Sequence, residues 1–171
     1  MIKLLGIMLV LFAGTMIGFQ QASRYTARTV QLRQLASALH RLETEIGYGQ
    51  TPLPAALARA AGQLKGPVGD LFRSAADRLD GSDQSFQECW KAAIADGWRW
   101  TALRGEERAA LSRLGGVLGI SDKEDQLKHL RIAAHQIQAE EQTARDEQAR
   151  FGKMWRSIGF LAAALVVILM V

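Results

Sequence analysis

The stretch that decides the fold of this chain reads Arg41-Leu-Glu-Thr-Glu-Ile-Gly-Tyr-Gly-Gln-Thr-Pro-Leu-Pro-Ala-Ala-Leu57. Apolar residues before and after its glycines recur at spacings of three and four, which places them along one face of a helix. Gly47 and Gly49 interrupt the pattern, Thr51 is a good N-cap residue, and Pro52 has the fixed φ that suits a first helical position. The stretch therefore predicts two helices joined by a tight turn and packed as an antiparallel hairpin. The predicted core residues of this hairpin are Leu35, Leu39, Leu42, Ile46, Leu53 and Leu57.

The same signals predict a third and a fourth helix beyond this hairpin. Pro67 can open the third helix, whose apolar residues recur at helical spacing up to the turn at Asp80-Gly81. Ser82 or Asp83 can cap the fourth helix, because both side chains accept hydrogen bonds from free backbone N–H groups.

A fifth and a sixth helix complete the pattern. We expect the fifth to begin near Gly105 and to end at Gly119, because glycine is common just past helix ends. Ser121 and Glu124 have the spacing of a capping box, which predicts the start of a long sixth helix. Runs rich in Val, Ile and Thr are missing from the middle of the chain. We therefore predict an all-α fold without a sheet, a compact antiparallel six-helix bundle.

The two ends of the chain are apolar. Residues 4–19 and 158–171 contain no charged side chain, and with their flanks they approach the roughly 17–25 residues that a membrane-spanning helix needs. A cleaved signal peptide is the alternative for the first run, although the residues after it offer no convincing Ala-x-Ala cleavage site. Trp155, between Lys153 and Arg156, is typical of an anchor at a membrane interface. We therefore predict a transmembrane helix at each end.

Much of the positive charge lies beside these apolar ends. The formal net charge is +4. The basic residues in question are Arg24, Arg28, Arg33, Arg41, Lys153 and Arg156. This placement favours a cytoplasmic central domain and argues against nucleic-acid binding, which would need basic and aromatic residues on one face. The expected segments are a transmembrane helix at 1–20, a cytoplasmic helical-bundle domain at 21–139, a polar helical stalk at 140–153 and a transmembrane helix at 154–171.

The motifs predict no catalytic residue, no cofactor-binding residue and no metal ligand. The glycines at 115–119 lack the Lys-Ser/Thr that completes a phosphate-binding loop. His129 and His135 are six residues apart, so they do not share a helical face, and His40 is distant in the sequence. Cys89 is the single cysteine, which excludes an intrachain disulfide, and we expect it to be a small buried core residue.

Tryptophans concentrate in the middle of the chain, at Trp90, Trp98 and Trp100. We expect these large rings to fill a core that is otherwise rich in alanine. An exposed aromatic binding platform is the alternative.

Several motifs together resemble the stage III sporulation protein AB family. In chain order they are Lys3-Leu-Leu-Gly6, Ala13-Gly14-Thr15 with Gly18, Arg33-Gln-Leu35, and Leu42-Glu43-x-Glu45-Ile46-x-Tyr48-Gly49-x-Thr51-Pro52-Leu53-Pro54-x-Ala56-Leu57. The last of these is the most specific, because few helical hairpins carry its residues in that order. With the apolar carboxyl end, the resemblance covers the whole chain.

The resemblance implies a fold and a role. The family is similar to the cytoplasmic helical domain of the inner-membrane platform protein of type II secretion and type IV pilus systems, a compact six-helix bundle. Its members belong to a complex built between mother cell and forespore, with a secretion-type ATPase, channel-ring proteins and a forespore-side partner. We therefore expect a non-enzymatic platform that links the ATPase to the channel. It would lie in the mother-cell membrane around the forespore, with its domain in the cytoplasm.

Two further expectations concern assembly and the alternative function. Secretion platform proteins carry two such domains and this chain carries one, so a homodimer could supply the second copy. The alternative function is a membrane-tethered signalling or regulatory module whose stalk transmits dimer geometry. Residues 140–150 are too polar for a strong two-stranded seam, which counts against it. An enzyme ranks third, because it would need a cavity lined by converging polar groups.

Overall fold

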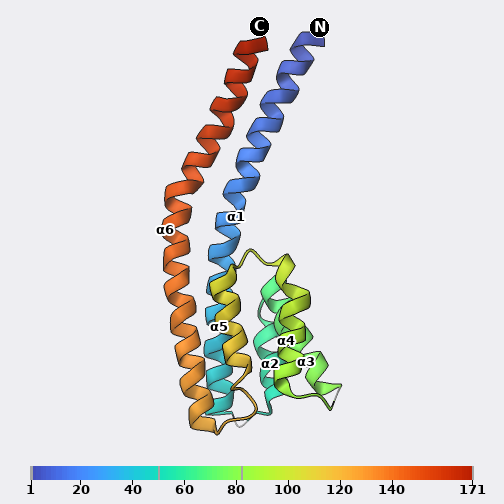
Figure 1. Ribbon diagram of the computed structural model, residues 1–171, viewed down its shortest axis with the longest axis vertical. Coiled ribbons are helices and arrows are strands. Elements are labelled where there is room, and N and C mark those ends of the chain that lie inside the picture. Colours follow the sequence, from blue (N-terminus) through green and yellow to red (C-terminus); the bar gives the residue numbers. More distant parts are fainter. Residues whose placement is uncertain (1, 50, 82, 171) are drawn as a thin grey trace. The chain divides into compact units, whose positions relative to one another are not determined.

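The computed structural model describes residues 2–49, 51–81 and 83–170, except for some side chains near both ends: 2–11, 14, 15, 17, 18, 21, 152, 153, 155, 156, 159, 160 and 162–170. The described residues form six α-helices and one short 3-10 helix, with no strand among them (Figure 1). The helices are α1 (Ile2–Gly47), α2 (Leu53–Gly62), α3 (Pro67–Asp80), α4 (Phe86–Gly97), η1 (Trp98–Trp100), α5 (Gly105–Gly115) and α6 (Lys123–Met170). The prediction of an all-α fold is confirmed.

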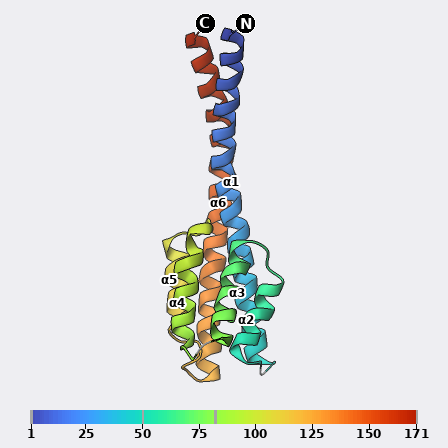
Figure 2. The same ribbon diagram turned by 90° about the vertical axis from the view of Figure 1, so that its right-hand side faces the viewer.

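The chain divides into two units. The helical domain is Val30–Glu141, and the terminal helix pair comprises Met1–Thr29 and Gln142–Val171. Both long helices, α1 and α6, contribute residues to both units. Within the helical domain, helices α2 to α5 lie beside α1 and α6 (Figure 2). Helix α1 continues without a break from Ile2 to Gly47, across the predicted boundary between segments 1–20 and 21–139. The predicted segment boundaries stay a prediction.

The hairpin that opened the sequence pattern joins α1 to α2. Pro52 occupies the N-cap position of α2, and no side chain caps this helix start. The expectation that Thr51 caps α2 is therefore wrong, because the Thr51 hydroxyl instead donates to Glu45 Oε2 at 2.8 Å. Among the predicted core residues, those that are buried are Leu35, Leu39, Leu42 and Leu57, and those that are partly exposed are Ile46 and Leu53.

The start of α4 differs from its predicted position. Ser85 is the N-cap, since its Oγ accepts from the Glu88 backbone N–H and the Glu88 carboxylate accepts from the Ser85 N–H at 3.0 Å. Asp83 does not cap the helix, and Ser82 lies outside the described residues. Ser85 and Glu88 have the Ser-x-x-Glu spacing of a capping box, a signal that the sequence already contained.

The start of α6 also uses a different cap. Asp122 Oδ1 accepts from the Asp125 backbone N–H at 2.8 Å, while the Ser121 hydroxyl donates back to the Val117 carbonyl at 3.1 Å. The predicted capping box of Ser121 and Glu124 is wrong, because the charged Asp122 carboxylate is the stronger acceptor next to the helix start.

The core of the helical domain gathers around Trp90. Its Nε1 donates to the Leu111 carbonyl at 2.8 Å. Its ring meets Phe72 edge-on, with centroids 5.3 Å apart, and stacks on Phe86 at 5.6 Å. Gly115 lies so close that a Cβ there would overlap the ring. One indole therefore joins α3, α4 and α5. Helix α5 ends at this glycine, four residues before the predicted end at 119.

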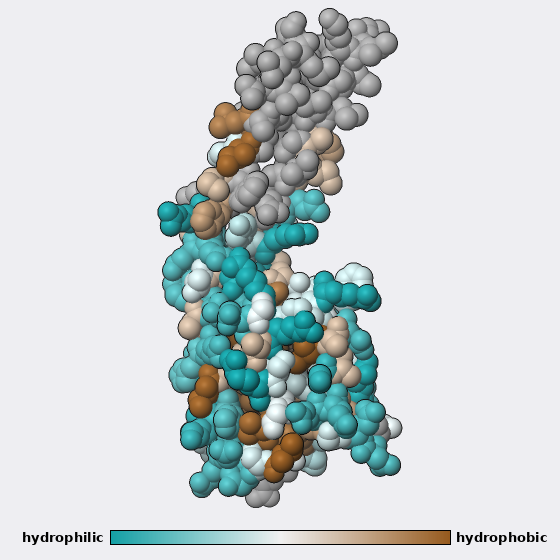
Figure 3. Space-filling view, in the orientation of Figure 1, coloured by the Kyte–Doolittle hydropathy of each residue, from teal (hydrophilic) through white to brown (hydrophobic). Residues whose placement is uncertain are grey.

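The surface and the apolar ends bear on the membrane prediction. The described surface in Figure 3 is mainly hydrophilic over the helical domain, with scattered apolar side chains. Among the described residues, no helix carries an apolar stretch long enough to cross a membrane. Most side chains of the predicted spans 1–20 and 154–171, including that of Trp155, lie outside the described residues. The two transmembrane helices therefore stay a prediction.

Candidate interaction surface

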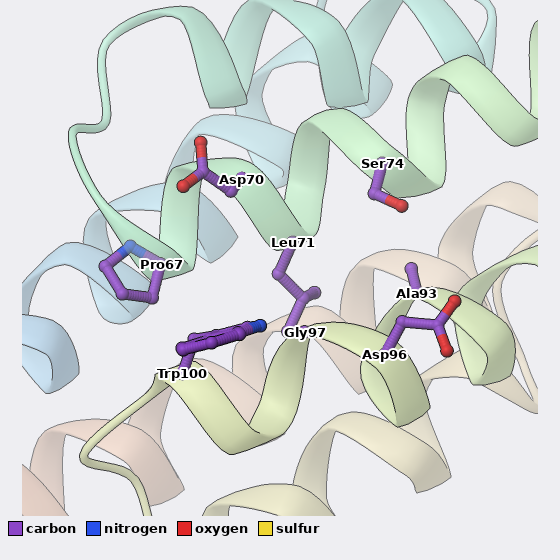
Figure 4. Close-up of a pocket in the computed structure, with 8 residues that line it drawn as sticks. All are labelled: Pro67, Asp70, Leu71, Ser74, Ala93, Asp96, Gly97 and Trp100. Carbon is purple, nitrogen blue, oxygen red and sulfur yellow. The ribbon is translucent and has the colours of Figure 1, made fainter.

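A hollow of about 270 Å³ opens between α3, α4 and η1 (Figure 4). Its borders follow from local sequence signals, because Pro67 fixes the start of α3 and α4 gives way to the 3-10 turn after Gly97. The lining residues are Pro67, Asp70, Leu71, Ser74, Ala93, Asp96, Gly97 and Trp100. Three consecutive elements thus build the site, and all belong to the helical domain.

The tryptophans do not share one environment. Trp90 is 1% exposed and Trp100 is 68% exposed, while Trp98 is partly exposed. The expectation that all three fill the core holds for Trp90 and is wrong for Trp100. The core beside α4 is already filled by the Trp90, Phe72 and Phe86 rings, and η1 follows the end of this helix, so Trp100 is left at the surface.

Two carboxylates border the hollow. Asp70 Oδ1 accepts from Arg73 Nη1 at 2.9 Å, and Asp96 Oδ2 accepts from Arg78 Nη2 at 2.6 Å. A third arginine, Arg99, places its Cζ 4.9 Å from the centroid of the Trp100 ring. None of the three arginines belongs to the lining. The hollow therefore presents aromatic and acidic groups.

The predicted turn is held by polar contacts around Glu45. Gly49 donates its backbone N–H to the Glu45 carbonyl at 3.1 Å. The Thr51 hydroxyl and Arg59 Nη1 each donate to Glu45 Oε2 at 2.8 Å. The Thr51 hydrogen bond, aided by Arg59, holds the pKa of the Glu45 carboxyl below its ordinary value. This carboxylate therefore links the end of α1 to α2.

Replacing Gly49 by valine is expected to lower the thermal midpoint of the helical domain. The backbone φ at Gly49 is not positive, but a Cβ would lie 2.8 Å from both the Glu45 carbonyl oxygen and Thr51 Oγ1. Overpacking of this kind costs about 1–3 kcal/mol. Pro52→Ala removes only a favourable helix start and should cost less. Thermal unfolding followed by circular dichroism compares the two, and equal shifts would contradict this account.

Charged contacts also connect α1 to α6 within the helical domain. Glu43 Oε1 accepts from Arg131 Nε at 2.5 Å, and Glu141 Oε1 accepts from Arg33 Nε at 3.0 Å. The hydrogen bond from Arg131 keeps the pKa of the Glu43 carboxyl below its ordinary value, although burial acts in the opposite direction. His40 Nδ1 lies 3.6 Å from the same carboxylate. These groups join two helices that are far apart in the sequence.

The terminal helix pair is joined by a second set of contacts. Arg28 is buried and places Nη1 3.3 Å from Glu147 Oε2, and the rings of Tyr25 and Phe151 stack with centroids 6.1 Å apart. The stretch 140–153, predicted as a solvated polar stalk, therefore presents one face to α1. The polar composition of this stretch did not indicate such a contact face, because Glu147 contacts α1 through an ion pair and not through apolar packing.

The described residues contain no group of three or more His, Cys, Asp or Glu side chains placed to hold a metal ion. His40 and His135 are exposed and His129 is partly exposed. Cys89 is fully buried, as predicted for a small core residue.

Comparison of this chain with known proteins gives consistent matches. The family described as stage III sporulation protein AB matches residues 3–171. Stage III sporulation protein AB of Bacillus subtilis (strain 168) is 40% identical over 170 residues, covering 99% of this chain and 99% of that protein. A solved structure of a stage III sporulation protein AB is similar with a TM-score of 0.69 at 37% identity, covering 72% of this chain and 98% of that chain.

Proposed function

Because the chain belongs to the stage III sporulation protein AB family, we propose that it is a membrane-anchored platform in a secretion-like channel complex between mother cell and forespore. In this role it links a cytoplasmic ATPase to the channel-ring proteins during endospore formation. The observation that carries the proposal is the family match over residues 3–171, which includes both apolar ends and the helical domain. The same match confirms the family resemblance of the sequence.

In this proposal the helical domain is a compact antiparallel six-helix bundle flanked by two transmembrane helices. Large exposed apolar side chains on the terminal helix pair support the membrane setting. On each helix they recur at spacings of four and three, so they lie along one face. They are Phe12, Met16 and Phe19 on α1, and Met154, Ile158 and Leu161 on α6. Exposed apolar surface of this kind marks contact with lipid or with another protein.

The proposal puts the two apolar ends, 1–20 and 154–171, in the mother-cell membrane around the forespore and the helical domain in the cytoplasm. The arginines that follow the first apolar run support this orientation, because basic residues are enriched on the cytoplasmic side of a span. We assign the chain a binding role and no catalytic one. Glu43, Glu45 and Glu88 support this assignment, since hydrogen-bond partners engage their carboxylates in contacts that stabilise the fold.

Site-specific photo-crosslinking in sporulating cells tests the proposed partner. A crosslinking amino acid is placed at Ala95 on α4 and, separately, at Ser112 on α5, both of which are exposed. We expect one of these surfaces to capture the secretion-type ATPase. Capture of a signalling protein in place of the ATPase would contradict the platform role and favour the regulatory module.

Fractionation and light scattering test the anchor and the assembly state. The full chain is expected in the membrane fraction, and the fragment 21–153, which lacks both apolar ends, in the soluble fraction. A soluble full chain would overturn the anchor. Light scattering of the fragment and of the full chain in detergent tests the proposed homodimer, which monomers in both samples would remove.

A further inference from the structure

The hollow between α3, α4 and η1 has the size of a site for one side chain. Pockets for drug-sized ligands or cofactors occupy about 300–1,000 Å³, and this one measures about 270 Å³ and is open to solvent on one side. Its volume lies just below that range and leaves room for a single long side chain reaching in from another protein.

The lining specifies the chemistry of that side chain. Figure 4 shows the Asp70 and Asp96 carboxylates on opposite sides of the Leu71 side chain, with the Trp100 indole, seen edge-on, to one side near Pro67. None of the eight lining residues is basic. A matching side chain has an apolar stem for the middle of the hollow and a positive head for its acidic borders, which describes arginine and lysine.

The two aspartates keep room for another cation. Asp70 contacts Arg73 through Oδ1, and Asp96 contacts Arg78 through Oδ2. A carboxylate has two oxygens that accept hydrogen bonds, so a second guanidinium or ammonium group can bind without displacing the first.

Trp100 adds a reason to regard this hollow as an interaction site. Tryptophan is one of the residue types enriched among interface hot spots. The Trp100 side chain is 68% exposed and is therefore accessible to a partner. Arg99 already lies over the ring, 4.9 Å from the centroid, so the ring is placed to attract cations through its π face.

We propose that the hollow binds one arginine or lysine side chain of a protein partner, with its stem on Leu71 and Trp100 and its head at Asp70 and Asp96. This inference rests on the proposed function, because it names the surface through which the platform meets a component of the complex.

A titration with defined peptides tests the assignment. The full chain in detergent carries four tryptophans. The nuclear magnetic resonance signal of the Trp100 indole N–H is assigned with the exposed-site variant Trp100→Phe. The probes are acetyl-Ala-Arg-Ala-amide and the same peptide with citrulline, which keeps the shape of arginine and removes its charge. We expect the arginine peptide to shift the Trp100 signal saturably and the citrulline peptide to bind at least about tenfold more weakly.

Matched variants separate the hollow from general attraction of a cation to the surface. Asp70→Asn combined with Asp96→Asn should weaken the arginine peptide roughly tenfold, since each lost charge pair at an exposed site is worth up to about one kcal/mol. Asp77→Asn removes the same charge from an exposed position of α3 outside the lining and should leave binding unchanged.

The outcomes are distinct. Equal binding of both peptides, an unchanged affinity in the double variant, or no saturable shift of Trp100 would overturn the assignment. Capture of the ATPase by the crosslinking positions at Ala95 or Ser112 alongside any of these results would leave the proposed function standing. If the Trp100 signal shifts on dilution of the chain alone, the hollow contacts a second copy, and the assignment to a partner is wrong.

Discussion

A Gly115→Val variant is expected to lose the native packing of the helical domain at temperatures where the unaltered chain is folded. A Cβ at this position would overlap Trp90 Cδ1 and lie 3.1 Å from Cγ and Nε1. The indole cannot retreat easily, because Phe72 and Phe86 hold it and its Nε1 is bonded to Leu111. Overpacking together with a lost buried hydrogen bond should cost about 3–5 kcal/mol. Near-ultraviolet circular dichroism and thermal unfolding measure the loss.

The control for this variant is Gly62→Val. Gly62 is the last residue of α2, as Gly115 is the last residue of α5. Nothing lies within 4 Å of a Cβ built at Gly62. The two substitutions therefore share the position at a helix end and the change of side chain, and they differ in the space available to the new side chain. A thermal midpoint for Gly115→Val that matches the Gly62→Val control would show that the contact with Trp90 is not a constraint.

Trp90→Ala is the second substitution with a large expected effect. Truncating a buried tryptophan to alanine leaves a cavity and typically costs about 3–5 kcal/mol. Here it also removes the Nε1–H group that donates to the Leu111 carbonyl, and the ring against which Phe72 and Phe86 pack. We expect a marked fall in the urea midpoint, measured in the same detergent as the unaltered chain.

Trp100→Ala provides the matched comparison, because it removes the same side chain from an exposed position. Substitutions at exposed sites usually change stability by no more than about 0.5 kcal/mol. A Trp100→Ala variant as unstable as Trp90→Ala would mean that the ring at Trp100 supports the core. The comparison thus separates the structural tryptophan from the one assigned to binding.

The sequence predicted the helices well wherever apolar spacing and a helix breaker agreed. Gly47 and Pro67 mark ends that the structure places at the same residues. The caps were less predictable, because several acceptors compete near one helix start. Ser85 and not Asp83 caps α4, and Asp122 and not Ser121 caps α6. The backbone geometry that decides between them is not encoded in the spacing of single residues.

The candidate site could not be predicted from the sequence. Trp98-Arg-Trp100 stood out as an aromatic concentration, but its composition favoured a place in the core over a binding platform. Only the packing of α3 on α4 shows that Trp90 fills the space and leaves Trp100 beside Asp70 and Asp96. The ion pair of Arg28 with Glu147 was hidden for a similar reason, since its members are 119 residues apart.

The contacts between α1 and α6 have a consequence for the order of events during synthesis. Arg33 and Glu141 are separated by 108 residues, which a ribosome adding about 5–20 residues per second needs roughly 5–20 s to make. Throughout that interval the leucines of α1 have been synthesised but lack the last helix of their domain. The nascent chain is therefore exposed to proteases and to aggregation until α6 emerges, and its folding is completed late in translation.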